Sequence, residues 1–201
     1  MKRNLILSVV LMIAVISSAI AQNFRVGIAG GIDASKIALS GGSGGPLNFR
    51  TEPAGGLSFE AVISPTFSVQ LEGNYSAQGT GVTDPEATTA GSYQFSYITI
   101  PLLAKLYGNK QLSFLVGPQL GILVKAKTKS SGDPDIDVKD QLETTDFYAV
   151  FGAEYRFANG VFISSRYNAG LKNIVKDEST NTEIKNRYFS FRIGYSFAIG
   201  N

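Results

Sequence analysis

Charged residues stand at alternate positions within segments of the chain that are otherwise apolar. The set comprises Arg25, Glu60, Glu72, Lys105, Glu154, Arg156, Arg166 and Arg192. Its glutamates could serve as a general acid and a general base if the fold gathered them in one cleft. They could equally form ion pairs with the basic side chains and be purely structural. Residue type alone does not distinguish a catalytic set from structural ion pairs. The distinction depends on the secondary-structure elements that position these side chains.

The chain contains no histidine and no cysteine. Without histidine, histidine-based triads, histidine metal sites and the usual general base near neutral pH are excluded. Without cysteine, disulfides and thiolate metal sites are excluded as well. We therefore predict no catalytic residue, no cofactor and no metal site, and we expect that the protein is not an enzyme.

Two loops resemble ligand-binding motifs without completing them. The acidic segment 132–143 carries Asp133, Asp135, Asp137 and Asp140. This alternation is similar to the start of a calcium loop, but the central glycine and the closing glutamate are missing at that spacing. The run GGSGGP at 41–46 lacks the Lys-Ser/Thr that follows a phosphate-binding loop. We interpret the two segments as a solvated external loop and a flexible loop tip.

Eight segments alternate apolar and polar residues, which is typical of strands whose two faces meet different solvents. They cover 24–34, 55–63, 66–76, 96–107, 111–125, 146–157, 160–171 and 187–198. The apolar half holds no charge, whereas the polar half holds the charged set together with Asp33, Gln70, Gln119 and Lys125. A Lys or Arg at mid-membrane on the apolar face would cost roughly 2–4 kcal/mol. The pattern therefore favours lipid on the apolar face and a polar interior.

Short and long connections alternate strictly between these segments. The short turns are 64–65, 108–110 and 158–160, and the long polar connections are 35–54, 77–95, 126–145 and 172–186. Outer-membrane barrels have short periplasmic turns and long external loops, so we predict an all-β, eight-stranded antiparallel up-and-down transmembrane β-barrel. A secreted lipocalin-type barrel is the alternative, with the opposite polarity. Pro101 and Pro118 fall inside predicted strands and should cause a bulge or a local distortion.

An eight-stranded barrel is only wide enough to be filled by its own side chains. Unpaired charges in such a lumen would suffer a desolvation penalty of several kcal/mol each. We therefore predict that the charged residues form a structural charge network in the lumen and not a catalytic acid and base. The network comprises Arg25, Glu60, Glu72, Lys105, Glu154, Arg156, Arg166 and Arg192.

The first residues have the pattern of a cleavable signal peptide. Lys2 and Arg3 precede the apolar run 5–16, and Ala19-Ile20-Ala21 is a small-x-small cleavage site. We predict a signal peptide over 1–21, cleaved after Ala21, and a barrel domain over 22–201. Without the signal, 16 basic and 16 acidic residues remain, so nothing suggests a nucleic-acid surface.

Two adjacent segments carry a family resemblance. YITIPLLAKL at 97–106 and LSFLVGPQLGIL at 112–123 resemble the PorT-like outer-membrane β-barrel family. The matching residues are Tyr97, Ile100, Pro101, Leu102, Leu103, Gly117 and Pro118. The last strand, FSFRIGYSF, is similar to the aromatic-ended insertion signal of such barrels, although four residues follow Phe197. The resemblance implies insertion by the barrel-assembly machinery, and one type of member takes part in secretion across the envelope.

We expect a non-catalytic outer-membrane barrel with a filled lumen, acting through long external loops or as a membrane-structural element. An accessory role in envelope transport or secretion, of the PorT-like kind, and a narrow pore stay open as alternatives. Expected partners are outer-membrane lipids, the barrel-assembly machinery, and a protein on the extracellular or periplasmic side. The expected state is a monomer in the outer membrane of a Gram-negative cell.

Overall fold

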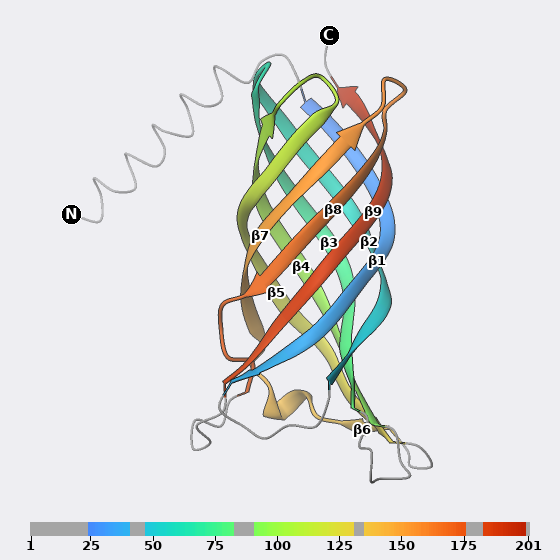
Figure 1. Cartoon of the computed structure of the whole chain (residues 1–201), viewed down its shortest axis with the longest axis vertical. Helices are drawn as coiled ribbons and strands as arrows, with labels where there is room; N and C mark the ends of the chain where they lie inside the picture. Colours follow the sequence, from blue (N-terminus) through green and yellow to red (C-terminus); the bar gives the residue numbers. More distant parts are fainter. Residues whose placement is uncertain (1–23, 41–46, 83–90, 131–134, 176–182, 200–201) are drawn as a thin grey trace, which may run out of the picture.

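The computed structural model describes residues 24–40, 47–82, 91–130, 135–175 and 183–199. Eight long strands form a closed antiparallel cylinder (Figure 1). They are β1 (Phe24–Ser40), β2 (Leu47–Ser64), β3 (Phe67–Val82), β4 (Gly91–Tyr107), β5 (Leu112–Ser130), β7 (Thr145–Arg156), β8 (Val161–Gly170) and β9 (Glu183–Ile199). A two-residue strand, β6 (Ile136–Asp137), and a short 3-10 helix, η1 (Lys139–Gln141), lie between β5 and β7.

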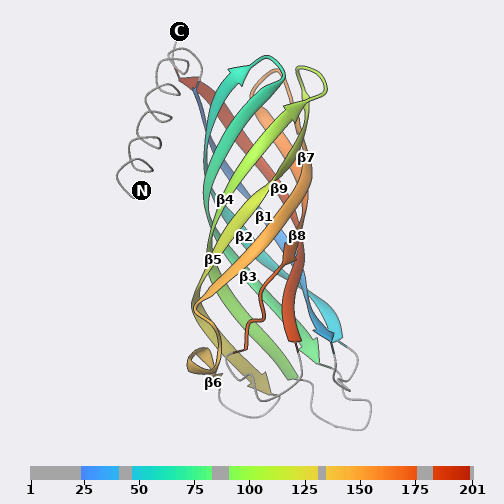
Figure 2. The same ribbon diagram turned by 90° about the vertical axis from the view of Figure 1, so that its left-hand side faces the viewer.

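The strands follow one another around the ring as an up-and-down meander. Each strand pairs antiparallel with its neighbours, β1 pairs with β9, and the β4–β5 pairing completes the cylinder. Phe24 is opposite Ile199, so the first and last described residues lie at the same end (Figure 2). The predicted signal peptide at 1–21 lies outside the described residues, among which no helix is long and apolar enough to cross a membrane.

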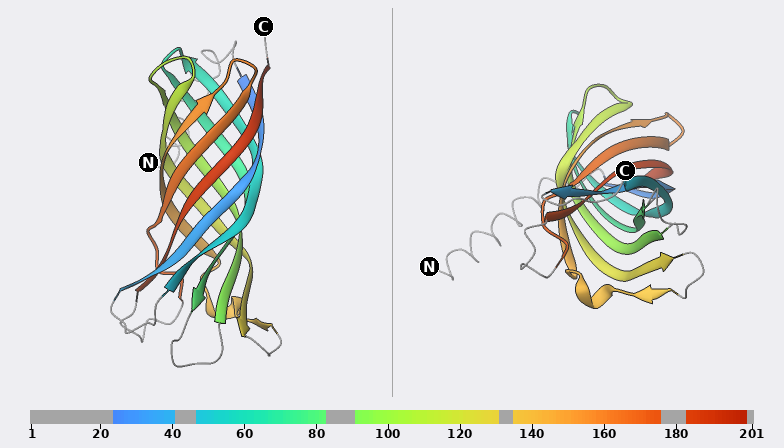
Figure 3. Two further views of the ribbon diagram at one scale, coloured as in Figure 1. Left: turned by 45° about the vertical axis from the view of Figure 1, so that its right-hand side comes forward. Right: turned by 60° about the horizontal axis from the view of Figure 1, so that its bottom comes forward.

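The two ends of the cylinder differ in their connections (Figure 3). The turn end carries 65–66, 108–111 and 157–160, and the opposite, loop end carries the connections from β1 to β2, β3 to β4, β5 to β7 and β8 to β9. The turn at 157–160 requires Gly160, whose φ of 90° is unfavourable for other residues.

The side chains show the predicted inversion of polarity. Ile28 and Ile193, at apolar positions of the alternating segments 24–34 and 187–198, are 60% and 61% exposed. Asp33 and Lys105 are 0% exposed in the interior. Apolar groups on the outside and ionic groups inside fit a lipid surround and exclude the lipocalin-type alternative.

Six of the eight long strands are longer than the sequence predicts, whereas β7 has the predicted length and β8 is shorter, and the connections at the loop end are correspondingly shorter. β1 continues to Ser40 instead of ending at 34, and β5 continues to Ser130 instead of 125. The predicted long connection 126–145 contains the end of β5, β6 and η1. Alternation of apolar and polar residues marks only the part of a strand that contacts lipid. Backbone pairing continues beyond it because ladder hydrogen bonds need no apolar face.

Neither Pro101 nor Pro118 produces a bulge. Pairing between β4 and β5 is interrupted after Pro101 and resumes at Ala104 and Val116 in the same register, which is the local distortion expected of proline. The shift of register lies instead between Ser96 and Tyr97, opposite β5.

That shift corrects the prediction for Lys125. An extra residue in one strand turns its neighbours toward the other face. Val124 and Lys125 are both exposed, while Leu123 and Ala126 on either side are buried. Lys125 therefore lies on the outer surface and not in the lumen.

Candidate functional site

The charged lumen begins near the turn end with a cluster around Lys105. Its Nζ lies 3.2 Å from Glu60 Oε2 and 2.8 Å from Glu154 Oε1. Arg156 Nη2 donates to the same two carboxylates at 2.8 and 2.9 Å. Arg25 Nη1 adds a contact of 3.3 Å to Glu60. Each glutamate therefore faces at least two cations, which offsets the cost of burying its charge.

A second ion pair lies deeper in the lumen. Arg166 Nη1 donates to Glu72 Oε2 at 2.7 Å, and Asn74 donates to the same carboxylate oxygen at 3.0 Å. Gln70 connects the two groups because it accepts from Lys105 and donates to Glu72. The cluster and the pair thus form one continuous hydrogen-bonded system.

A third ion pair involves an acid that the predicted network omits. Arg192 Nη2 lies 2.7 Å from Asp33 Oδ1, and Ser190 donates to that oxygen at 2.7 Å. Ser76 donates to Asp33 Oδ2 at 2.5 Å. Asp33 and Arg25 are an even number of residues apart on β1, so their side chains face the same side of the strand. The alternation of the sequence was therefore enough to include Asp33 in the predicted network.

Three of these lumen contacts join strands on opposite sides of the ring. Glu60 of β2 meets Arg156 of β7, and Glu72 of β3 meets Arg166 of β8. Toward the loop end, Asn186 of β9 donates to the hydroxyl of Tyr97 of β4 at 3.2 Å. The two strands of each pair are four positions apart in the ring of eight. The lumen is therefore crossed along its full width at three levels.

An apolar layer occupies the lumen at the loop end. Phe95, Tyr97, Leu123, Ala126 and Leu142 form a buried cluster, against which Val138 and Val175 pack. The sequence predicts a polar lumen and does not identify this layer. Tyr97 and Lys105 are an even number of residues apart on β4, so strand alternation predicts that both face the lumen, and this could have identified the layer from the sequence.

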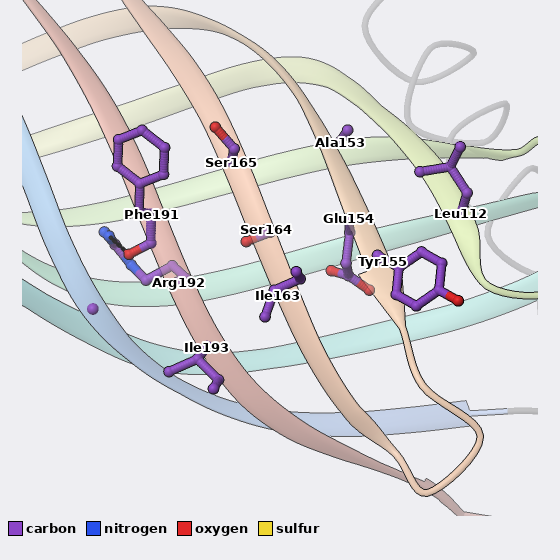
Figure 4. A pocket seen from close by; sticks show the side chains of 11 residues that line it. Leu112, Ala153, Glu154, Tyr155, Ile163, Ser164, Ser165, Phe191, Arg192 and Ile193 are labelled. Carbon is purple, nitrogen blue, oxygen red and sulfur yellow. Dashed lines mark hydrogen bonds between the residues drawn. The ribbon is translucent and has the colours of Figure 1, made fainter.

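A hollow of about 510 Å³ lies on the outer wall of β7, β8 and β9 (Figure 4). Ala153 and Ser165 are directly opposite one another in the β7–β8 pairing, and their short side chains leave space between Tyr155 and Phe191. Glu154 and Arg192 also line the hollow, but their charged groups are engaged in the lumen ion pairs. The hollow thus offers an apolar surface to lipid and no reactive group.

All eight charged residues predicted for the lumen take part in ion pairs. Each of their three carboxylates contacts a cation, as in a structural network. In the part of the chain that the structure describes, no group of three or more acidic side chains is placed to hold a metal ion. Asp135 pairs with Lys127 at 3.1 Å, while Asp133 and the run 41–46 lie outside the described residues.

Comparison with known proteins agrees with this architecture. A family model described as "Outer membrane protein beta-barrel domain" matches residues 20–176. No curated protein sequence matches the chain.

Two solved structures are similar in fold. Ail, the attachment invasion locus protein of Yersinia pestis, solved with the heparin analogue sucrose octasulfate, has a TM-score of 0.52 at 15% identity, covering 87% of this chain and 99% of that one. Neisserial surface protein A has a TM-score of 0.52 at 14% identity, covering 87% and 97%. Most of the chain matches the family model, and the fold is that of eight-stranded outer-membrane barrels, so the protein belongs to the outer membrane protein beta-barrel domain family.

Proposed function

We propose that this protein is a closed, non-catalytic outer-membrane barrel that acts through its loop end. The observation that carries the proposal is the set of contacts across the full width of the lumen. Glu60–Arg156 and Glu72–Arg166 span it at 2.8 and 2.7 Å, and Tyr97–Asn186 spans it at 3.2 Å. Contacts at hydrogen-bond distance between opposite walls leave no path for a hydrated ion at those levels.

The loop end supports the second half of the proposal. A tilted strand needs about 9–11 residues to cross the hydrocarbon layer. β1 to β5 and β9 have 16 to 19 residues, so each has several to spare. The apolar cluster holds η1 against this extension through Leu142. Ile136 in β6 is 60% exposed there. A projecting end with exposed apolar groups is suited to contact with an external partner.

The proposal includes the expected biogenesis. The chain is exported by a signal peptide cleaved after Ala21, inserted by the barrel-assembly machinery, and monomeric. The short turns then face the periplasm and the loop end faces outward, as in other outer-membrane barrels.

Single-channel recording in planar bilayers tests the closed lumen. We expect no steady openings from the wild-type barrel. We expect openings only from a variant that removes all three crossing contacts, carrying Glu60→Ala, Glu72→Ala, Tyr97→Ala, Arg156→Ala and Arg166→Ala. Steady openings from the wild type would instead support the narrow pore.

Site-specific photo-cross-linking in intact cells tests whether the loop end or the turn end contacts a partner protein. A cross-linker at Ile136 reports on the loop end, and one at Lys110 reports on the turn end. We expect a protein adduct from Ile136. An adduct from Lys110 alone would favour the PorT-like secretion accessory, and no adduct from either position would favour a purely membrane-structural role.

A further inference from the structure

A pocket of about 490 Å³ opens at the turn end of the barrel, apart from the loop end proposed to act outside the cell. It lies between the start of β1, the turns at 108–111 and 157–160, and the end of β9. Arg25, Lys110 and Arg156 line it, and no acidic side chain is among the described residues that do. The described lining of the pocket therefore carries three cationic side chains and no anionic one.

The neighbouring carboxylates neutralise only part of this charge. Glu60 and Glu154 are each 2% exposed and are occupied by Lys105 and Arg156. Together with Arg25, that buried cluster has three cations for two anions. Lys110 adds a further positive charge and makes no ion pair with any described residue.

Two of the cations are held close to one another. Arg25 Nη1 and Arg156 Nη1 each lie 3.4 Å from the hydroxyl of Tyr107, so the two guanidinium groups converge on one point. Glu60 contacts both guanidinium groups, at 3.3 and 2.8 Å, but it also pairs with Lys105, so a further anion beside the two groups would offset the positive charge that remains.

The pocket also has unused hydrogen-bonding groups. Arg156 Nε and Ser196 Oγ are buried and have no hydrogen-bond partner among the described residues, and both residues line the pocket. A buried donor without a partner costs free energy that an acceptor in the pocket would recover. Guanidinium groups bind planar or tetrahedral oxyanions through several parallel hydrogen bonds.

We propose that this pocket binds a phosphate group carried on a small polar molecule. Its volume falls within the range of small-molecule sites, about 300–1,000 Å³, and exceeds what a bare phosphate would fill. The phosphate could belong to a soluble periplasmic phosphate monoester or to the headgroup of an inner-leaflet lipid, because the exposed Phe157 extends the rim of the pocket toward the membrane.

Isothermal titration calorimetry on the intact barrel in a nonionic detergent, in buffer free of phosphate, tests the proposal. The probes are glycerol 3-phosphate, glycerol as its uncharged counterpart, and short-chain phosphatidylglycerol. Saturable binding of glycerol 3-phosphate is expected for a soluble ligand. Binding of phosphatidylglycerol alone would identify a lipid headgroup as the source.

Matched variants locate the site. Lys110→Gln should weaken binding about tenfold, as loss of a charge-assisted contact does. Ser196→Ala should weaken it less, while Arg187→Gln, which removes an exposed cation on β9 far from the turn end, should leave it unchanged. Heat-modifiable migration in gels confirms that each variant is folded. The proposal is overturned if neither phosphate probe binds saturably, if glycerol binds equally well, or if Arg187→Gln weakens binding as much as Lys110→Gln.

Discussion

Arg166 Nη1 lies 2.7 Å from Glu72 Oε2 although their strands, β8 and β3, are on opposite sides of the ring. Both side chains are almost fully buried. A contact of this kind ties two walls of the barrel that no backbone hydrogen bond connects. Removing one partner of a buried pair leaves an uncompensated charge, which costs more than the pair itself contributes.

This relationship predicts strong energetic coupling between the two residues. Glu72→Gln and Arg166→Met should each lower the free energy of unfolding by about 3–5 kcal/mol. The double variant should lose less than the sum, with a coupling on the order of 0.5–3 kcal/mol. Because the chain has no tryptophan, urea unfolding in lipid vesicles is best followed by circular dichroism.

The matched control is the pair Lys172–Glu143, whose side chains are 39% and 31% exposed at 2.6 Å. Lys172→Met should cost only about 0–1 kcal/mol, as exposed pairs do. Strict additivity of the Glu72 and Arg166 substitutions would contradict the assigned contact.

The outer surface of β4 allows a test of membrane depth. Leu102 and Leu106 face outward with 49% and 50% exposure, but Leu106 is next to the turn end. Leu102→Arg should cost roughly 2–4 kcal/mol, and Leu106→Arg about 0–1 kcal/mol, because the cost of a charge falls toward the interface. The yield of folded barrel after insertion into vesicles measures the difference. Equal yields would place these residues at the same depth and contradict the orientation.

The attachment of η1 depends on one buried side chain. Leu142 packs into the apolar cluster at the loop end, and its backbone forms a bridge with Val175. Leu142→Ala should release this segment and increase trypsin cleavage after Lys139, while the unfolding temperature of the barrel stays unchanged. Ile136→Ala, at an exposed position nearby, should leave cleavage at the wild-type rate. Mass spectrometry of the fragments decides, and unaltered cleavage in Leu142→Ala would show that other contacts hold η1.

Two glycines on the barrel wall should respond oppositely to alanine. A Cβ added at Gly117 would lie 2.0 Å from the carbonyl oxygen of Leu102, whereas one at Gly73 would meet nothing within 4 Å. Gly117→Ala should therefore cost about 1–3 kcal/mol through overpacking. Gly73→Ala should be neutral or stabilise by about 0.4–1 kcal/mol by restricting the unfolded chain. The temperature at which heat-modifiable migration is lost ranks the two variants, and the reverse order would refute the close approach of β4 and β5 at Gly117.

Strand alternation predicts most of the fold because it is a local property. Glu72 and Phe191 lie on the expected faces, since successive residues of a strand point to opposite sides whatever the neighbouring strands are. The prediction fails for Lys125, where a shift of register between β4 and β5 changes the face. A bulge depends on the pairing of two strands distant in sequence, so one strand read alone does not reveal it.

The sequence by itself determined the polarity of the wall, the up-and-down order of the strands and most of the charged residues in the lumen, because period-two alternation and turn residues act over a few positions. Only the tertiary structure decided which charges meet. Glu72 reaches Arg166 and Asp33 reaches Arg192 because closure of the ring and the register of each strand set the height and direction of every side chain. The height and direction of a side chain in the barrel are set only when all eight strands are paired, so they cannot be derived from the sequence of one strand.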